Sequence, residues 1–427
     1  MFKFIISGEL FFALFLLAGY FKEALQVPID LTATFFILSV LCAVLRIGRT
    51  LFTNKINNRE NMISKKIMLH AFLFLIFFGF IWLSNYYTLG SKYSLEKTLK
   101  FSTFTAWAFF GVYFLINNRK SLRNFLKSLA LIALIMSLYT VLGLQKSPGG
   151  ESGFTAVAGD NYLGLGRSSG LGALIFISLY ITTDSKKFVK VLSLCSVLVI
   201  LTALFASGSR MPLISFIIVF FTAFFTSVKI RKGIVYIRKG FSYFIALLGL
   251  GIISTLALAS TGIFDTVIRR LSILFTETDG GTSAEGRIER YKTAYETWVN
   301  HPIFGTGVGS FPIHFDGIDI VDYPHNIFLE LLSELGLIGL LLFLLFIVYP
   351  IYIVVLNRKI KAVFLHSEIL TSLFCFMFFF LNACTTGDIN DNRLLFTFSS
   401  LVVVSFVLTN RDNNVALNNT DSLKNAS

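Results

Sequence analysis

One histidine in this 427-residue chain stands where a side chain could act as a base. His325 follows Pro324 and directly precedes a long apolar run. Because proline fits the first turn of a helix, we expect His325 in that turn, at the positive end of the helix dipole. The dipole disfavours imidazolium, so the ring would stay neutral and able to accept a proton. The alternative is a histidine that only caps the helix at a membrane interface.

Three arginines could add phosphate-binding chemistry to such a site. Arg210 lies in the short turn SGSRMP, and Arg287 and Arg290 lie three residues apart in one long polar segment. Arginine presents planar, permanently charged donors that match phosphate oxygens. These arginines could therefore bind a diphosphate, and only their convergence with His325 on one outward-facing cavity would favour that function. Arg210 could instead reach lipid headgroups, and the other two could pair with neighbouring glutamates or with lipid phosphate.

Other polar patterns read as structural. Glu330 and Glu334 lie one turn apart on the helix after His325, and we expect them to hold the arginines in place. The run Gly305 to Gly309 lacks the strand and lysine of a nucleotide loop, so we interpret it as a flexible turn. Glu9 lies within an apolar run and is predicted to be paired inside the bundle. No cluster of carboxylates, cysteines or histidines predicts a metal site or a disulfide framework.

The elements that must position these residues are membrane helices. Hydrophobic residues make up 55% of the chain and charged residues only 14%, against about 25% charged in an average soluble domain. Apolar runs of about 20 residues, long enough to cross a bilayer, recur from end to end. We predict an all-α polytopic membrane protein with about twelve transmembrane helices and one large external helical loop. The predicted spans are 4–20, 29–45, 67–84, 101–117, 125–144, 171–183, 188–206, 212–228, 241–262, 326–356, 364–383 and 394–410.

The distribution of the net charge of +13 argues against nucleic acid as a partner. The basic residues cluster in short loops between apolar runs, which is the positive-inside pattern. With a cytoplasmic N-terminus, 24 lysines and arginines fall on the inner side and 13 on the outer side. Both termini are then cytoplasmic, and the candidate site faces outward. The predicted units are spans one to nine (1–262), the external loop with amphipathic helices (263–325), spans ten to twelve (326–410) and a disordered cytoplasmic tail (411–427).

Two segments on the outer side break the pattern of short connections. The Gly- and Ser-rich stretch 145–170 is predicted to be an external loop, and 263–325 is the only long hydrophilic insertion. Within the insertion, Ile288, Tyr291, Tyr295 and Trp298 recur at helical spacing. We expect this aromatic face to lie against the membrane surface or the bundle.

Three stretches together resemble the O-antigen ligase and polymerase superfamily: SGSR, GRIERYKTAYETWVNHPIFGTGVGSF and PHNIFLELLSELGLIG. Its members are membrane glycosyltransferases of the GT-C type that act on polyprenyl-diphosphate-linked glycans. The resemblance implies that Arg210 and Arg287 hold the diphosphate and that His325 activates the acceptor hydroxyl. Arg290 is included on its spacing alone, and Arg167 in DNYLGLGRSSG is a further candidate near the donor site. The family is metal-independent, and we expect no cofactor.

The resemblance leaves the acceptor open. A polymerase would add the growing glycan to the next lipid-linked unit, whereas a ligase would move finished glycan onto a lipid core. The opening LLAGYFKEALQVPIDLT is more similar to polymerase-type members. The implied partners are the lipid-linked donor, a glycan or lipid-core acceptor, inner-membrane lipids, and flippase and chain-length regulator proteins. The alternative function of a different class is that of a flippase or transporter for the same glycans. Ionisable residues near the middle of the membrane and discontinuous helices would then be expected.

Overall fold

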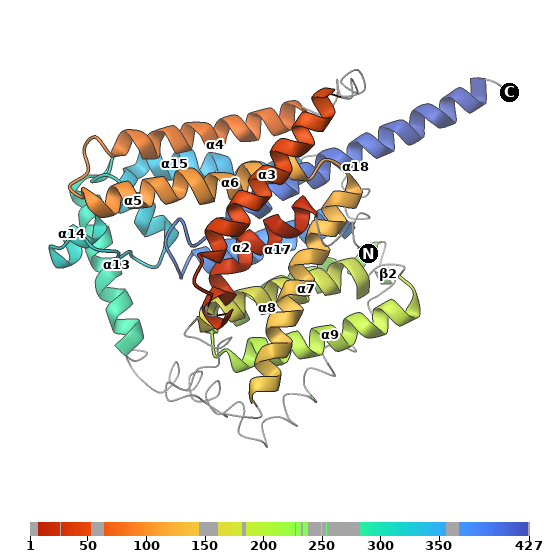
Figure 1. Cartoon of the computed structure of the whole chain (residues 1–427), viewed down its shortest axis with the longest axis horizontal. Coiled ribbons are helices and arrows are strands. Elements are labelled where there is room, and N and C mark those ends of the chain that lie inside the picture. The colour runs from red at the N-terminus through yellow and green to blue at the C-terminus, as the bar shows by residue number, and fades with distance from the viewer. Residues whose placement is uncertain are drawn as a thin grey trace.

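The computed structural model describes residues 7–25, 27–52, 64–144, 161–181, 185–226, 228–231, 234–237, 282–355 and 367–425, together with positions 249 and 253. Helices dominate this part of the chain and pack side by side as a bundle (Figure 1). Seven of the described helices are long and apolar enough to cross a membrane, and two shorter helices are also apolar. The protein is therefore a polytopic helical membrane protein, as predicted. The predicted number of about twelve spans is not confirmed.

Eleven of the twelve predicted spans overlap helices that the structure describes. The ninth, 241–262, lies outside the described residues apart from two isolated positions. The other eleven coincide with α2 (Gly8–Leu25), α3 (Leu31–Phe52), α4 (Lys65–Ser84), η2 (Phe101–Thr105) with α6 (Ala106–Leu115), α7 (Arg119–Leu144), α8 (Tyr162–Phe176) with η3 (Ile177–Ile181), α9 (Lys187–Ala206), α10 (Arg210–Thr226), α15 (Ile327–Val355), α17 (Ser367–Ala383) and α18 (Arg393–Asn425).

Four features of the fold differ from the prediction. A short antiparallel hairpin, β1 (Val228–Arg231) with β2 (Ile234–Ile237), interrupts the all-α pattern, with Val228 opposite Ile237. Helix α5 (Lys92–Lys100) extends the fourth span backwards through η2 into one continuous rod. Helix α18 continues to Asn425, so the tail predicted to be disordered is helical there. An existing helix adds one hydrogen bond per residue, which makes such an extension easier than a new start.

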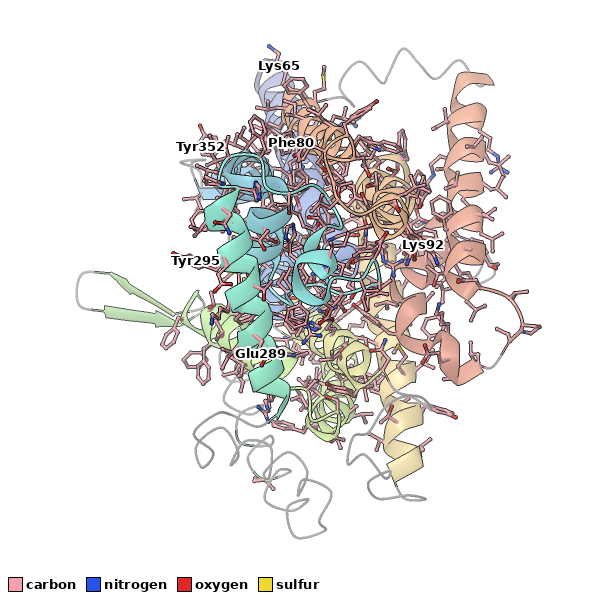
Figure 2. The ribbon with its side chains drawn as sticks, turned by 90° about the vertical axis from the view of Figure 1, so that its left-hand side faces the viewer. Lys65, Phe80, Lys92, Glu289, Tyr295 and Tyr352 are labelled. Carbon is pink, nitrogen blue, oxygen red and sulfur yellow. The ribbon has the colours of Figure 1, made fainter. Side chains whose placement is uncertain are left out.

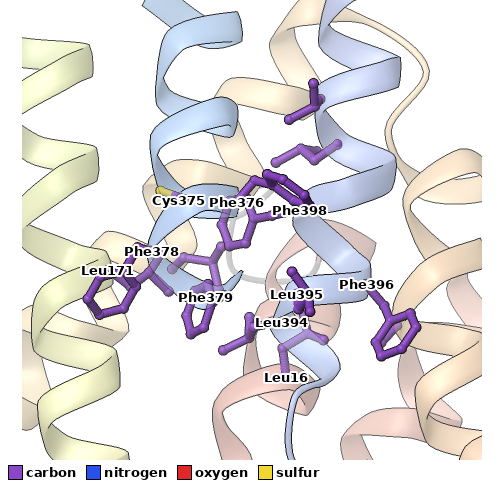
Figure 3. Packing of buried hydrophobic residues seen from close by; sticks show 14 of the residues in the cluster. Leu16, Leu171, Cys375, Phe376, Phe378, Phe379, Leu394, Leu395, Phe396 and Phe398 are labelled. Atoms are coloured by element: carbon purple, nitrogen blue, oxygen red, sulfur yellow. The ribbon is translucent and has the colours of Figure 1, made fainter. Parts of the chain in front are cut away.

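The fourth difference concerns α8, which begins at Tyr162 although we predicted an external loop through residue 170. Its span is 94% buried inside the bundle. The glycines that suggested a loop serve close packing instead, because a Cβ at Gly170 would overlap the ring of Phe378. Figure 3 shows Phe378 of α17 beside Leu171 of α8 in this part of the core. Small residues bring α8 close to its neighbours.

Helix α15 is interrupted at Gly336, whose backbone angles are φ 64° and ψ −166°. The segment 302–310 fills the break with its own backbone groups, so the polar groups that the break releases are satisfied. Four hydrogen bonds of 2.8 to 3.2 Å join this segment to α15. Before the break, the carbonyls of Ser333 and Glu334 accept from the N–H groups of Thr306 and Gly307. After it, the N–H groups of Leu337 and Ile338 donate to the carbonyls of Pro302 and Ile303.

The glycine run that we interpreted as a flexible turn is therefore a fixed part of the fold, and that interpretation was wrong. Gly305, Gly307 and Gly309 have φ values of 69°, 94° and 70°. A Cβ at Gly305 would overlap the backbone of Glu334, and one at Gly307 would overlap the backbone of Thr88. Glycine permits both the left-handed conformation and the close approach.

Helix α13 (Thr282–Asn300) and the short α14 (Phe311–Asp316) lie together at one end of the bundle, opposite the far end of α18 (Figure 1). Helix α13 crosses that end, with Tyr295 on its outer side (Figure 2). Its buried face contains Ala294 and Thr297, whereas Ile288 and Tyr295 are more than half exposed. Tyr291 and Trp298 of the same face are half-buried, so its placement against the membrane surface or the bundle stays a prediction.

Asp319 fixes the insertion to the transmembrane helices. Its carboxylate accepts hydrogen bonds from the backbone N–H groups of Ser91, Lys92 and Tyr93, at 2.8 to 3.1 Å. These donors hold the pKa of Asp319 below its ordinary value. The carboxylate thus caps α5 from a distant part of the chain, which aligns the insertion with the bundle. Glu9 on α2 forms an ion pair of 2.9 Å with Arg46 on α3, which confirms the predicted pairing of Glu9.

Candidate active site

A cavity of about 460 Å³ gathers charged side chains from opposite ends of the chain. Its walls come from α2, α8, α13, α18 and the segments that precede α15 and α18. Four arginines and one carboxylate line it, which leaves an excess of positive charge that suits an anionic ligand. The ionisable lining residues of interest are Arg167, Arg287, Arg290, His325, Asp391 and Arg393.

His325 lies just outside the helix that we expected it to open. Helix α15 begins at Ile327, and the side chain of Asn326 accepts hydrogen bonds from the N–H groups of residues 328 and 329, at 2.9 and 3.1 Å. Asparagine is among the best N-cap residues, so it sets the helix start in place of Pro324. His325 itself has φ 57°, a left-handed conformation that is rare for a residue other than glycine. The predicted first-turn position was wrong by two residues.

The environment of His325 keeps its imidazole neutral. Burial lowers its pKa to about 4, and the positive charges of Arg287 and Arg290 act in the same direction. The ring of Tyr323 contacts the imidazole edge to face, with centroids 4.6 Å apart. At neutral pH the ring can therefore accept a proton from a ligand in the cavity. We predicted a neutral ring on account of the helix dipole, whereas the main causes are burial and two arginines.

The two arginines of α13 differ in how they are held. Arg290 forms a two-pronged ion pair with Asp322, with Nε–Oδ1 and Nη2–Oδ2 distances of 3.0 and 2.9 Å. Its guanidinium also lies 4.7 Å from the ring centre of Phe315. Among the described side chains, Arg290 therefore pairs with Asp322 and not with the neighbouring Glu289. Arg287, by contrast, has no hydrogen bond or ion pair with any residue that the structure describes, so its donors are available to a ligand.

Arg210 is not among the residues that line the cavity. It is the first residue of α10 and is half-buried. Its neighbour Ser209 packs against Gly166, next to Arg167 on α8. The structure thus brings His325, Arg287 and Arg290 to one cavity, and Arg210 does not line it. A role for Arg210 in diphosphate binding stays a prediction.

Glu330 and Glu334 hold a lysine and not the arginines, so that prediction was wrong. The Nζ of Lys97 lies 2.7 Å from a carboxylate oxygen of each glutamate. All three side chains are at most 3% exposed. Lys97 lies on α5, which continues into the fourth predicted span, so it reaches the glutamates from inside the bundle. Ionisable side chains buried in a membrane bundle pair with one another, as Lys97 does with the two glutamates.

Sequence reasoning missed Arg393 and Asp391, and it treated Arg167 only as a candidate. Arg393 had a usable signal, because a lone arginine at the predicted outer end of the last span departs from the positive-inside pattern. The same observation drew attention to Arg210. Nothing in the local sequence showed that the ends of α8 and α18 meet α13. Among the described residues, no group of three or more His, Cys, Asp or Glu side chains is arranged to hold a metal ion.

Residues 194–344 match the family model described as O-antigen ligase. This segment, about a third of the chain, is similar to the O-antigen ligase family. The match confirms the resemblance to the O-antigen ligase and polymerase superfamily, and it indicates a glycosyltransferase-like membrane enzyme with lipid-linked glycan substrates. It spans Arg210, Arg287, Arg290 and His325, but not Arg167, Asp391 or Arg393. No curated protein matches the chain.

Proposed function

We propose that this O-antigen ligase-family protein is a polymerase for surface polysaccharide. It transfers glycan from a polyprenyl-diphosphate carrier to an acceptor sugar hydroxyl at the outer face of the inner membrane. One observation carries the proposal: the neutral imidazole of His325 lines the same positively charged cavity as the guanidinium of Arg287, which has no partner among the residues that the structure describes. A base and an oxyanion-binding group are the two functions that glycosyl transfer from a diphosphate requires.

The reaction follows from these two groups. A ring nitrogen of His325 takes the proton of the acceptor hydroxyl while the oxygen attacks the anomeric carbon of the donor. The bond between that carbon and the diphosphate oxygen breaks, and its electron pair stays on the leaving diphosphate. Arg287 stabilises the charge that develops there. The imidazolium then returns its proton to water or to the diphosphate, and the energy of the leaving group replaces any need for ATP.

The paired Arg290 has a supporting role in this scheme. Asp322 fixes its guanidinium, and Gly286 accepts a further hydrogen bond from its Nη1 at 3.0 Å. The residue therefore stiffens the turn of α13 that carries Arg287. Its charge also helps to keep His325 neutral before substrate binds. Arg290 thus orients the site and tunes the base.

The transport alternative has one observation in its favour, the discontinuous helix α15. In transporters, such breaks expose backbone groups to a substrate near the middle of the membrane. Here the break at Gly336 is filled by the segment 302–310, whose backbone groups satisfy those of α15. The interruption therefore serves to seat the insertion. This difference favours the transferase.

The test is a gel of surface polysaccharide from a deletion strain that carries the wild-type gene, His325→Ala or an empty vector. We expect a ladder with wild type and, without it, cores that carry a single repeat unit. Cores without any repeat unit, together with polymer on its carrier lipid, would identify a ligase instead. Carrier-linked units trapped on the inner face would identify a transporter. A full ladder from His325→Ala would remove the histidine from the mechanism.

A further inference from the structure

His325, the base of the proposed reaction, has no hydrogen bond that fixes its ring. Neither ring nitrogen bonds to a residue that the structure describes. A catalytic histidine is usually oriented by a third group, a carboxylate or a carbonyl that bonds one of its two nitrogens. The imidazole of His325 therefore needs another contact that keeps a nitrogen directed into the cavity.

The ring of Tyr323 supplies such a contact. Its centroid lies 4.6 Å from that of the imidazole, and the two planes meet at 67°, which is an edge-to-face arrangement. Both residues are half-buried and line the same cavity. Aromatic pairs favour this geometry, so the phenol ring restrains the rotation of the imidazole without using either of its nitrogens. Both nitrogens stay available to a ligand.

Tyr323 is itself held by a carboxylate. Its hydroxyl lies 3.4 Å from Oδ2 of Asp391, in the segment that precedes α18. Burial, together with the negative charge of Asp391, raises the pKa of Tyr323, so the hydroxyl stays protonated and donates to that oxygen. The N–H of Asp391 donates in turn to Oδ1 of Asp388 at 2.8 Å, which fixes the segment. Contacts therefore run from Asp391 through Tyr323 to the base.

The backbone around the base is anchored on both sides. The carboxylate of Asp322 pairs with Arg290 and accepts the N–H of Tyr323 at 2.7 Å. Asn326 caps α15 on the other side. Between these anchors, His325 has the left-handed φ of 57°, a strained conformation that persists only where its surroundings fix it. The backbone therefore sets the position of the base, whereas the rotation of its ring depends on Tyr323.

We propose that Tyr323 is the positioning residue of the base: its ring holds the imidazole of His325 toward the cavity, and Asp391 fixes its hydroxyl. The inference rests on the proposed function, because it requires that His325 accepts the proton of the acceptor hydroxyl. Tyr323 acts through His325 and not on the glycan. Its contribution should therefore appear in the rate of the chemical step, and only while His325 is present.

The first test measures kcat and KM for polymer formation from purified lipid-linked repeat units at neutral pH. Tyr323→Leu removes the ring, and we expect kcat to fall about 10²-fold, the effect of displacing a reacting group by about 1 Å. KM should stay within about twofold of wild type, because only the chemical step changes. Tyr323→Phe keeps the ring and loses the hydroxyl, so kcat should fall only about fivefold. Tyr86→Leu is the matched control at a side chain that is 89% exposed and does not line the cavity, and it should be fully active.

The second test asks whether Tyr323 acts through His325. His325→Gln alone and His325→Gln combined with Tyr323→Leu should have the same residual turnover, because no base is left to orient. Likewise, Asp391→Asn should lower kcat about as much as Tyr323→Phe, and the two combined should cost no more than either one. Additive losses in either pair would mean that the residues act independently, which overturns the proposal.

The acid limb of kcat/KM gives a third readout, which a bracing role elsewhere in the bundle would not move. Burial is the main cause that lowers the pKa of His325 to about 4. The charged groups that act on it are Arg287 and Arg290, which lower the pKa, and Asp322 and Asp391, which raise it. In Tyr323→Leu, water reaches the imidazole, so the limb should move to higher pH. In Asp391→Asn a negative charge is lost, so the limb should move to lower pH.

The remaining outcomes separate this inference from the proposed function. A raised KM with unchanged kcat in Tyr323→Leu would mean that the tyrosine binds sugar, which overturns the inference. A lower melting temperature with wild-type kinetics would make Tyr323 a packing residue and also overturn it, while the polymerase stands. Wild-type turnover in His325→Gln would contradict the base and the inference together. If wild type instead moves finished glycan onto a lipid core, the polymerase fails, and the same losses of kcat in that assay would support the inference alone.

Discussion

The Lys97 cluster (Lys97, Glu330 and Glu334) and the arginine cavity both gather charged side chains, but only the cluster neutralises them within the chain. In the cluster, the ammonium lies 2.7 Å from both carboxylates and the adjoining void is only about 10 Å³. In the cavity of about 460 Å³, within the described part of the chain, Arg287 has no ion pair, and Arg167 and Arg393 each have a buried nitrogen without a hydrogen-bond partner.

The difference separates a structural role from a binding role. Charges that are neutralised by their neighbours tie elements together, and the cluster joins α5 to the interrupted α15. Ile389 donates its N–H to the same Glu330 at 3.2 Å, so the segment before α18 is tied in as well. Charges that lack a partner need one from outside the chain. Substitutions in the two regions should therefore have different consequences.

The largest expected effect is on the cluster. Lys97→Met leaves two carboxylates buried without their cation, and breaking such a pair costs about 3–5 kcal/mol of stability. We expect the variant to lose its monodisperse peak in detergent and to melt well below wild type. Lys97→Met combined with Glu330→Gln and Glu334→Gln should recover much of that loss. A single variant as stable as wild type would mean that the cluster is not structural.

The second effect is on Arg287, and it should appear in catalysis without loss of fold. Arg287→Ala removes a donor to the leaving diphosphate, for which about 10²–10³-fold in turnover is typical. The melting temperature should stay at the wild-type value, because this side chain has no partner among the described residues. Lys292→Ala, on the same helix, is the matched control and should be fully active. The assay is polymer formation from purified lipid-linked repeat units.

His325→Gln should lower turnover by about 10²–10⁴-fold, the contribution of a general base. Binding of polyprenyl diphosphate should be unchanged, since the imidazole does not hold the diphosphate in this mechanism. His325→Gly adds a separate comparison, because glycine accepts the left-handed backbone at this position more readily. It should be at least as stable as His325→Gln and equally inactive. Retained turnover in both variants would exclude the histidine as the base.

Local sequence patterns predicted most of the helices. The contacts of the candidate site could not be predicted from them, because they depend on how distant helices pack. Apolar runs located eleven helices because span length is dictated by the bilayer. They failed at α8, where glycines that resemble a loop allow close packing, and at Gly336, where a break is filled from 30 residues away. His325, Arg287 and Arg290 share one chain segment and were found. Arg167 and Arg393 are more than 200 residues apart in the sequence and lie outside the segment matched by the O-antigen ligase family.

The smallest effect should be on the pH dependence of kcat/KM, whose acid limb should move in opposite directions in two variants. His325 acts as a base only when neutral, so kcat/KM should fall as the pH drops through the pKa of the free enzyme, about 4. Arg287 lowers this pKa and Asp322 raises it. Arg287→Gln should therefore move the acid limb to higher pH, on its residual activity, and Asp322→Asn should move it to lower pH.

The two shifts distinguish charge effects from loss of structure. Asp322→Asn also weakens the ion pair with Arg290, a partly exposed pair whose loss costs about 1 kcal/mol or less, so stability should change little. A general loosening of α13 would instead let water reach His325 and raise its pKa in both variants. Acid limbs that move in the same direction would thus show that burial alone keeps the ring neutral. Opposite movements, with no movement in Lys292→Gln, would show that the charges around the cavity change the pKa of His325 directly.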